Sequence, residues 1–72
     1  MFFPSRDIVE RVKKEYPAGT RVELVRMDDF QAPPIGTLGT VIGVDDTGSI
    51  MVSWDNGSSV NVIYNVDKCI KI

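Results

Sequence analysis

Side chains that could act in catalysis or bind a metal are few in this sequence. The chain has no histidine and one cysteine, Cys69, which excludes histidine-based catalytic triads, zinc sites built from His or Cys, and internal disulfides. Without a neighbouring histidine, Cys69 is interpreted as a small strand residue rather than a nucleophile. We therefore expect a protein that is not an enzyme, with no catalytic residue, cofactor or metal site.

The remaining candidates for chemistry are carboxylates in predicted tight turns, at Asp45, Asp46 and Asp55. A calcium loop needs a longer series of spaced oxygen ligands than these turns provide. A hydrolase with two carboxylates needs a cleft between them, and a chain of 72 residues has little room for one. The aspartates are therefore interpreted as turn residues whose side chains bond the backbone.

An aromatic residue among acids is the strongest candidate for a binding surface. Phe30 follows Asp28 and Asp29 in a long predicted loop, 28–36, which also contains a proline pair ending at Pro34. The prolines cannot donate to a strand ladder, so this stretch is predicted to be a loop. Two interpretations stay open: Phe30 is exposed for binding, or it folds back as a lid on the open end of the domain.

Basic side chains near the N-terminus form a second candidate surface. The net charge is −2, but segment 5–16 carries four basic and three acidic side chains, whereas segment 20–72 carries four basic and seven acidic ones. The four N-terminal cations are Arg6, Arg11, Lys13 and Lys14. They fit a solvated helix face of mixed charge, or alternatively a nucleic-acid-binding edge, against which the acidic loops count.

The first element that positions these residues is a short amphipathic helix over 5–16. Ser5 is the expected N-cap, and Pro17 and Gly19 end the helix. Phe2 or Phe3 is expected to pack back on the helix as a hydrophobic staple. The apolar stripe of the helix consists of Ile8, Val9, Val12 and Tyr16.

From Thr20 onward, β-branched residues and regularly spaced turn residues predict five short strands. The strands are expected at 20–27, 37–44, around 50–54, around 60–62 and at 68–72, with a turn at 64–67 before the last. Glycines 36, 39 and 43 mark a bend, a bulge or a close backbone approach.

Two loops of three residues, 46–48 and 55–57, put the apolar residues of the middle strands on one face. This face includes Trp54, which is therefore expected in the core rather than as a ligand platform. The expected pairs are Val44 with Ile50, Ile42 with Val52, Trp54 with Ser58, Val52 with Val60 and Ile50 with Val62.

Three segments, GTRVELV at 19–25, PIGTLGTVIGV at 34–44 and IMVSWDNG at 50–57, resemble an uncharacterised bacterial domain family found as small proteins and in mobile genetic elements. The resemblance implies a mainly-β fold, a small five-stranded SH3-like barrel preceded by one short helix. In such barrels the long first loop flanks a peptide groove, which implies that Tyr64 faces Phe30 across it. A looser similarity to KOW domains implies RNA or protein binding.

We therefore expect a single domain over 1–72 that binds another protein or an extended peptide through Phe30, Tyr64, Asp28, Asp29 and Pro34. The alternatives are a KOW-like nucleic-acid-binding module and a domain that homo-oligomerises through a strand edge or through Met1-Phe2-Phe3. The single cysteine and the lack of a signal peptide or membrane span favour the cytoplasm.

Overall fold

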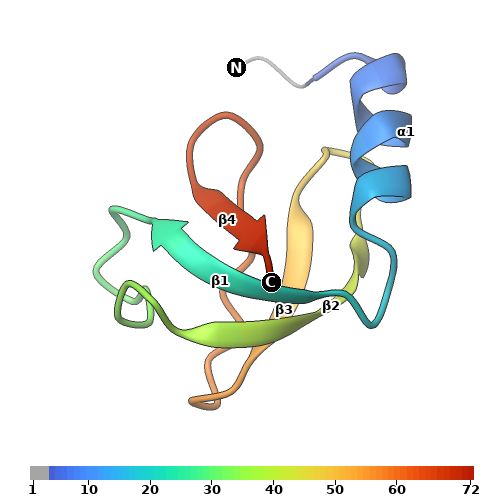
Figure 1. Cartoon of the computed structure of the whole chain (residues 1–72). Coiled ribbons are helices and arrows are strands. Elements are labelled where there is room, and N and C mark those ends of the chain that lie inside the picture. The colour runs from blue at the N-terminus through green and yellow to red at the C-terminus, as the bar shows by residue number, and fades with distance from the viewer. Residues whose placement is uncertain (1–3) are drawn as a thin grey trace.

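The computed structural model describes residues 4–72 as one short helix beside a four-stranded antiparallel sheet (Figure 1). The elements are α1 (Arg6–Glu15), β1 (Arg21–Arg26), β2 (Leu38–Val44), β3 (Ile50–Trp54) and β4 (Lys68–Lys71). The strand order is β3-β2-β1-β4. The prediction of a mainly-β domain with one helix is confirmed. Within the described residues, no helix has the length and apolar character that a membrane span requires.

Helix α1 begins and ends where the sequence places its caps. The Ser5 hydroxyl accepts a hydrogen bond from the Ile8 N–H at 3.3 Å, and the N–H of Tyr16 donates to the Val12 carbonyl at 2.9 Å. Gly19 then takes a positive φ of 94°, which turns the chain into β1. The expected staple from Phe2 or Phe3 falls outside residues 4–72.

Both predicted three-residue loops are confirmed. In the first, the Gly48 N–H donates to the Asp45 carbonyl at 3.0 Å, and in the second, the Gly57 N–H donates to the Trp54 carbonyl at 3.0 Å. Gly48 and Gly57 have φ values of 82° and 92°, which glycine adopts without strain. The expected pairs of Val44 with Ile50 and of Trp54 with Ser58 follow from these loops.

The prediction of a fifth strand around 60–62 is wrong. This segment is reduced to one bridge between Val62 and Ile50. The physical reason lies in Trp54, whose indole Nε1–H donates to the Val60 carbonyl at 2.8 Å. That carbonyl is the one that a ladder to Val52 would use, so the expected Val52–Val60 pair does not form. Over residues 4–72, β3 and β4 are the two ends of an open sheet, not neighbours in a closed five-stranded barrel.

The expected pairing of Ile42 with Val52 is also wrong. The ladder pairs Val41 with Val52 and then Gly43 with Met51, so Ile42 is the extra residue of a β-bulge. The bulge shifts the alternation of inward and outward side chains by one residue, so Val41 is 1% exposed and Ile42 is 59% exposed. Apolar residues stand at both positions, so the sequence pattern does not indicate the shift.

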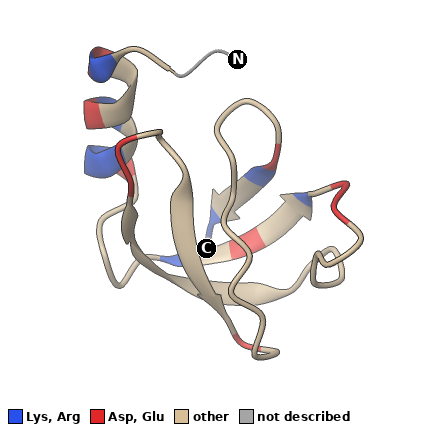
Figure 2. Ribbon diagram, turned by 180° about the vertical axis from the view of Figure 1, so that it is seen from behind, with Lys and Arg blue, Asp and Glu red and all other residues tan. Residues whose placement is uncertain are grey.

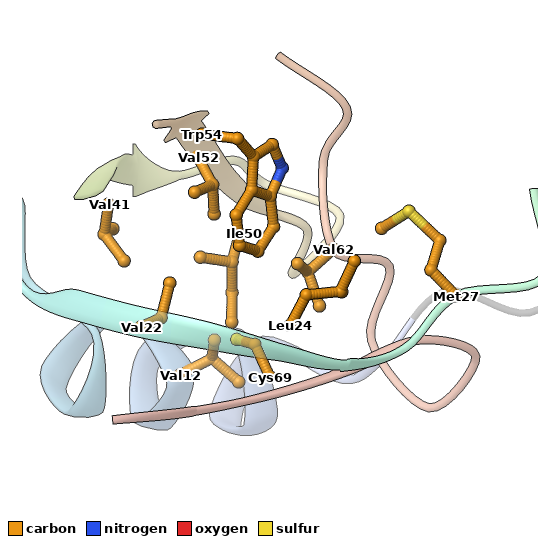
Figure 3. Close-up of a cluster of buried hydrophobic side chains, with 10 residues drawn as sticks. All are labelled: Val12, Val22, Leu24, Met27, Val41, Ile50, Val52, Trp54, Val62 and Cys69. Carbon is orange, nitrogen blue, oxygen red and sulfur yellow. The ribbon is translucent and has the colours of Figure 1, made fainter. Parts of the chain in front are cut away.

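The core lies between the concave face of the sheet, α1 and the segment that returns along β3 (Figure 3). Val22 and Leu24 are fully buried, as their alternation in β1 predicts, and Trp54 is 2% exposed. Val12 of α1 lies next to Cys69 of β4 (Figure 3). Cys69 is a strand residue of β4, as predicted, and burial raises the pKa of its thiol to about 11, so the thiol is protonated at neutral pH.

Candidate functional site

The loop between β1 and β2 is a structured element built from two hydrogen-bonded turns. In the first turn, the Ala32 N–H donates to the Asp29 carbonyl at 2.9 Å, and the Gln31 N–H donates to Asp29 Oδ1 at 2.8 Å. In the second turn, the N–H and the hydroxyl of Thr37 both donate to the Pro34 carbonyl, at 3.0 and 2.6 Å. Each turn is therefore closed by two hydrogen bonds.

Buried side chains and two bonds to β1 anchor this loop to the sheet. The Gly36 N–H donates to the Leu24 carbonyl at 2.8 Å, and the Leu24 N–H donates to the Thr37 carbonyl at 2.9 Å. Met27 at the start of the loop and Pro33 in its middle are buried. Because both ends and the centre are fixed, the turn tips project from a rigid base.

Phe30 occupies the tip of the first turn and is 95% exposed. The interpretation of Phe30 as a lid on the core is therefore wrong. Ile35 holds the corresponding position in the second turn and is 61% exposed. Asp28 and Asp29 directly precede Phe30 and are exposed, and Arg26 approaches Asp28 at 3.7 Å. We call Phe30, Ile35 and the two aspartates the loop surface.

Tyr64 does not join the loop surface. It is 39% exposed in the turn before β4, and its Cβ lies 3.6 Å from the position that a Cβ on Gly48 would take. The turn around Tyr64 and the loop around Phe30 lie apart in both ribbon views (Figures 1 and 2). The predicted groove between these two aromatic residues is therefore not formed. Phe30 projects from the loop into solvent.

Tyr64 instead lines a hollow of about 260 Å³ between α1 and the segment leading to β4. Its lining includes the buried residues Ile50 and Val62, which we call its floor, and the more exposed Tyr16 and Tyr64, which we call its walls. Two carboxylates, Glu15 and Asp67, line the same hollow, which we call the tyrosine hollow. These residues come from segments far apart in the chain, so no sequence pattern indicates that they lie together.

The tyrosine hollow combines aromatic rings with negative charge. Burial raises the pKa of Tyr16, and the negative forms of Cys69 and Glu15 raise it further, so its hydroxyl is protonated at neutral pH. The Lys71 ammonium lies over the Tyr16 ring, 5.5 Å from its centre. Tyr16 therefore already receives one cation from the chain itself.

The basic residues of α1 are interleaved with acids rather than gathered in a patch (Figure 2). Arg6 and Lys13 line a second hollow of about 400 Å³ together with Glu10 and Asp46. The Lys13 ammonium also lies 3.3 Å from an Asp46 carboxylate oxygen. Arg11 and Lys14 are exposed on the same helix.

The turn aspartates have two different roles. Asp45 Oδ1 accepts hydrogen bonds from the Thr47 hydroxyl and from the backbone N–H groups of Thr47 and Ser49, which lowers the pKa of Asp45. Asp55 instead forms a bidentate pair with Arg21 at 2.6 and 2.9 Å, and these bonds lower the pKa of Asp55. The first role was predicted from the sequence, whereas no sequence pattern indicated the ion pair between β1 and the second hairpin loop.

Fold and surface together define a small mainly-β domain that displays an exposed aromatic side chain on one hydrogen-bonded loop and has a tyrosine-lined hollow elsewhere. The family model described as "Domain of unknown function (DUF4314)" matches residues 5–72, so the chain belongs to this family. No curated protein matches the chain. Membership in the family confirms the resemblance to an uncharacterised family and assigns no activity.

Proposed function

We propose that this protein is a non-enzymatic interaction module that binds a partner protein through the loop surface. The observation that carries the proposal is Phe30, which is 95% exposed at the tip of a hydrogen-bonded turn. Burying a phenylalanine side chain is worth about 1.5–3 kcal/mol, and the fold of this chain does not use that energy. A partner with an apolar pocket gains it on binding.

Rigidity of the loop strengthens this proposal. Binding costs about 0.5–1.5 kcal/mol for each mobile side chain that is ordered, and more for a mobile loop. Asp29 and Pro34 close the two turns, so the backbone under Phe30 and Ile35 is ordered before a partner arrives. A buried aromatic side chain is a common energetic centre of a protein interface, and here Phe30 projects from an ordered backbone.

The charge of the loop surface indicates the chemistry of the partner. Asp28 and Asp29 lie beside Phe30, and Arg26, 3.7 Å from Asp28, pairs with it on the solvent-exposed surface, where such a pair is weak. The partner pocket is therefore expected to be apolar inside and to carry Lys or Arg at its rim.

The wider setting of this proposal rests on the resemblance described for the sequence. It comprises a bacterial origin, a link to mobile genetic elements, a cytoplasmic location and an evolutionary relation to SH3-like barrels. The open sheet, with residues 58–62 lying along β3, is compatible with a barrel whose fifth strand has been reduced to one bridge.

The proposal is tested by capture of partners from bacterial lysate with the tagged chain, with and without nuclease. The test variant is Phe30→Ser, and the matched control is Ile42→Ser, which removes an exposed aliphatic side chain from the other end of β2. We expect one partner to be captured by the wild type and the control in both nuclease conditions. Phe30→Ser should reduce its recovery at least about tenfold.

Three results would contradict the proposal. Equal capture by Phe30→Ser would remove the loop surface from binding. Loss of the captured protein on nuclease treatment would favour the α1 cations and a nucleic-acid ligand. Recovery of further copies of this chain alone would favour homo-oligomerisation.

A further inference from the structure

The tyrosine hollow is a second surface, separate from the loop surface, and it has the features of a binding site for one side chain. Its volume of about 260 Å³ lies below the range of about 300–1,000 Å³ typical of small-molecule pockets. Its floor of Ile50 and Val62 is apolar and buried, while its walls are the two tyrosines. This arrangement fits an aliphatic stem that lies on the floor and ends in a polar head.

The charged residues that line the hollow indicate that the polar head of the bound side chain is a cation. Glu15, Asp67 and Lys68 are the charged residues that line the hollow, so its lining is net negative. None of the three takes part in an ion pair within residues 4–72. Aromatic rings attract a cation over their faces, and Lys71 already takes such a position on Tyr16 from outside the hollow.

At Asp67, lysine is favoured over arginine. One carboxylate oxygen of Asp67, Oδ2, accepts a hydrogen bond from the Ile63 N–H at 2.9 Å. A guanidinium gains most from a carboxylate whose two oxygens are both free for a bidentate pair, whereas an ammonium is a compact charge that needs one oxygen at a time. We propose that the tyrosine hollow binds the side chain of a lysine residue of a partner protein, with its stem on Ile50 and Val62 and its ammonium between Glu15 and Asp67. The inference does not rest on the loop surface.

The test is an NMR titration of the whole chain with Nα-acetyl-lysine methylamide, compared with the same compound acetylated at Nε as a neutral analogue. We expect saturable shifts of the Gly48, Val62 and Tyr64 amides with a dissociation constant in the millimolar range. The neutral analogue should bind at least about fivefold more weakly, since it lacks the cation.

Two variants separate the hollow from general charge attraction. Glu15→Gln should weaken binding about fivefold, while Glu10→Gln removes the same charge from α1 outside the hollow and should leave it unchanged. Tyr64→Ser, with its spectrum otherwise preserved, should also weaken binding. Equal binding of the neutral analogue, equal effects of the two glutamate variants, tighter binding of the matching arginine derivative, or no saturable shift would each overturn the inference.

Discussion

Trp54 and Phe30 are aromatic residues of similar apolar character in opposite environments. Trp54 is 2% exposed, and its indole N–H is satisfied by the Val60 carbonyl at 2.8 Å. Phe30 is 95% exposed, although the turn that carries it is closed by two hydrogen bonds, from the Ala32 N–H to the Asp29 carbonyl and from the Gln31 N–H to Asp29 Oδ1. Exposure of Phe30 is therefore a property of the folded structure and not of a loose chain.

Trp54 contributes to the stability of the fold, whereas Phe30 is exposed and should contribute little to it. The Trp54 side chain buries apolar surface in the core and donates a hydrogen bond to Val60, which helps to fix the path of residues 58–62. Around Phe30, the turn is closed by Asp29 and Ala32, and the phenyl ring contributes nothing to it. Substitutions in the two regions should therefore affect different measurements.

The largest effect on stability is expected for Trp54→Ala. Loss of a buried tryptophan costs about 3–5 kcal/mol, a large part of the stability of a small domain. Trp54→Phe keeps most of the apolar volume and leaves the Val60 carbonyl without its donor, so it should cost about 1–3 kcal/mol. Urea unfolding measures both variants, and equal losses for Ala and Phe would show that packing around Trp54 is not the dominant contribution.

The second effect concerns the glycine on which Trp54 packs. A Cβ on Gly39 would lie 2.6 Å from Val52 Cγ1 and 2.7 Å from Trp54 Cε3, whereas a Cβ on Gly43 would meet only the flexible end of Met51, at 3.3 Å. Gly39→Ala should cost about 2–3 kcal/mol, and Gly43→Ala, in the same strand, less than about 0.5 kcal/mol. Similar unfolding free energies for the two variants would contradict the packing described for β2 and β3.

A smaller loss of stability is expected at acidic pH. Hydrogen bonds from Thr47 and Ser49 lower the pKa of Asp45, and bonds from Arg21 lower the pKa of Asp55. A carboxylate with a lowered pKa in the folded state stabilises the protein fully above its unfolded pKa, and this contribution is lost as the pH falls through the folded pKa. The unfolding free energy should therefore decrease below about pH 4.

Asp45→Asn tests the source of this acid sensitivity. Asparagine keeps the acceptor oxygen that closes the turn but does not titrate, so the variant should lose less stability than the wild type between about pH 5 and pH 2. Parallel losses in the two proteins, measured by urea unfolding at each pH, would show that other groups cause the decrease.

The smallest effect on stability is expected for Phe30→Ser. Because the phenyl ring is almost fully exposed, the unfolding free energy should change by less than about 0.5 kcal/mol. A loss comparable to that of Trp54→Phe would mean that Phe30 belongs to the core in solution, and the loop surface would then not exist as described.

Local sequence patterns predicted the parts of the fold that local rules determine. Ser5 caps α1, Gly48 and Gly57 close the three-residue loops, and Val22 and Leu24 share the buried face of β1. The bulge at Ile42 and the loss of the fifth strand were not predictable in this way. The bulge is not indicated because Val41 and Ile42 are both apolar. The fifth strand is lost where the Trp54 indole bonds the Val60 carbonyl, a contact that depends on the folded chain.

The candidate site was predicted in part for a similar reason. An aromatic residue between acids and prolines has no strand position, and this pattern drew attention to Phe30. Tyr16, Gly48 and Tyr64 meet only in the folded chain, where the helix, the first hairpin loop and the last turn surround the same hollow. No local pattern indicates such a contact between distant segments.

The most direct test of the central claim is photo-crosslinking at position 30 in living bacterial cells. A photoreactive phenylalanine analogue placed at Phe30, which is 95% exposed, is compared with the same analogue at Ile42, which is 59% exposed on the bulge of β2. If the loop surface binds a partner protein, position 30 should give one discrete adduct with a second protein and position 42 none. No adduct from position 30, or the same adducts from both positions, would contradict binding through the loop surface.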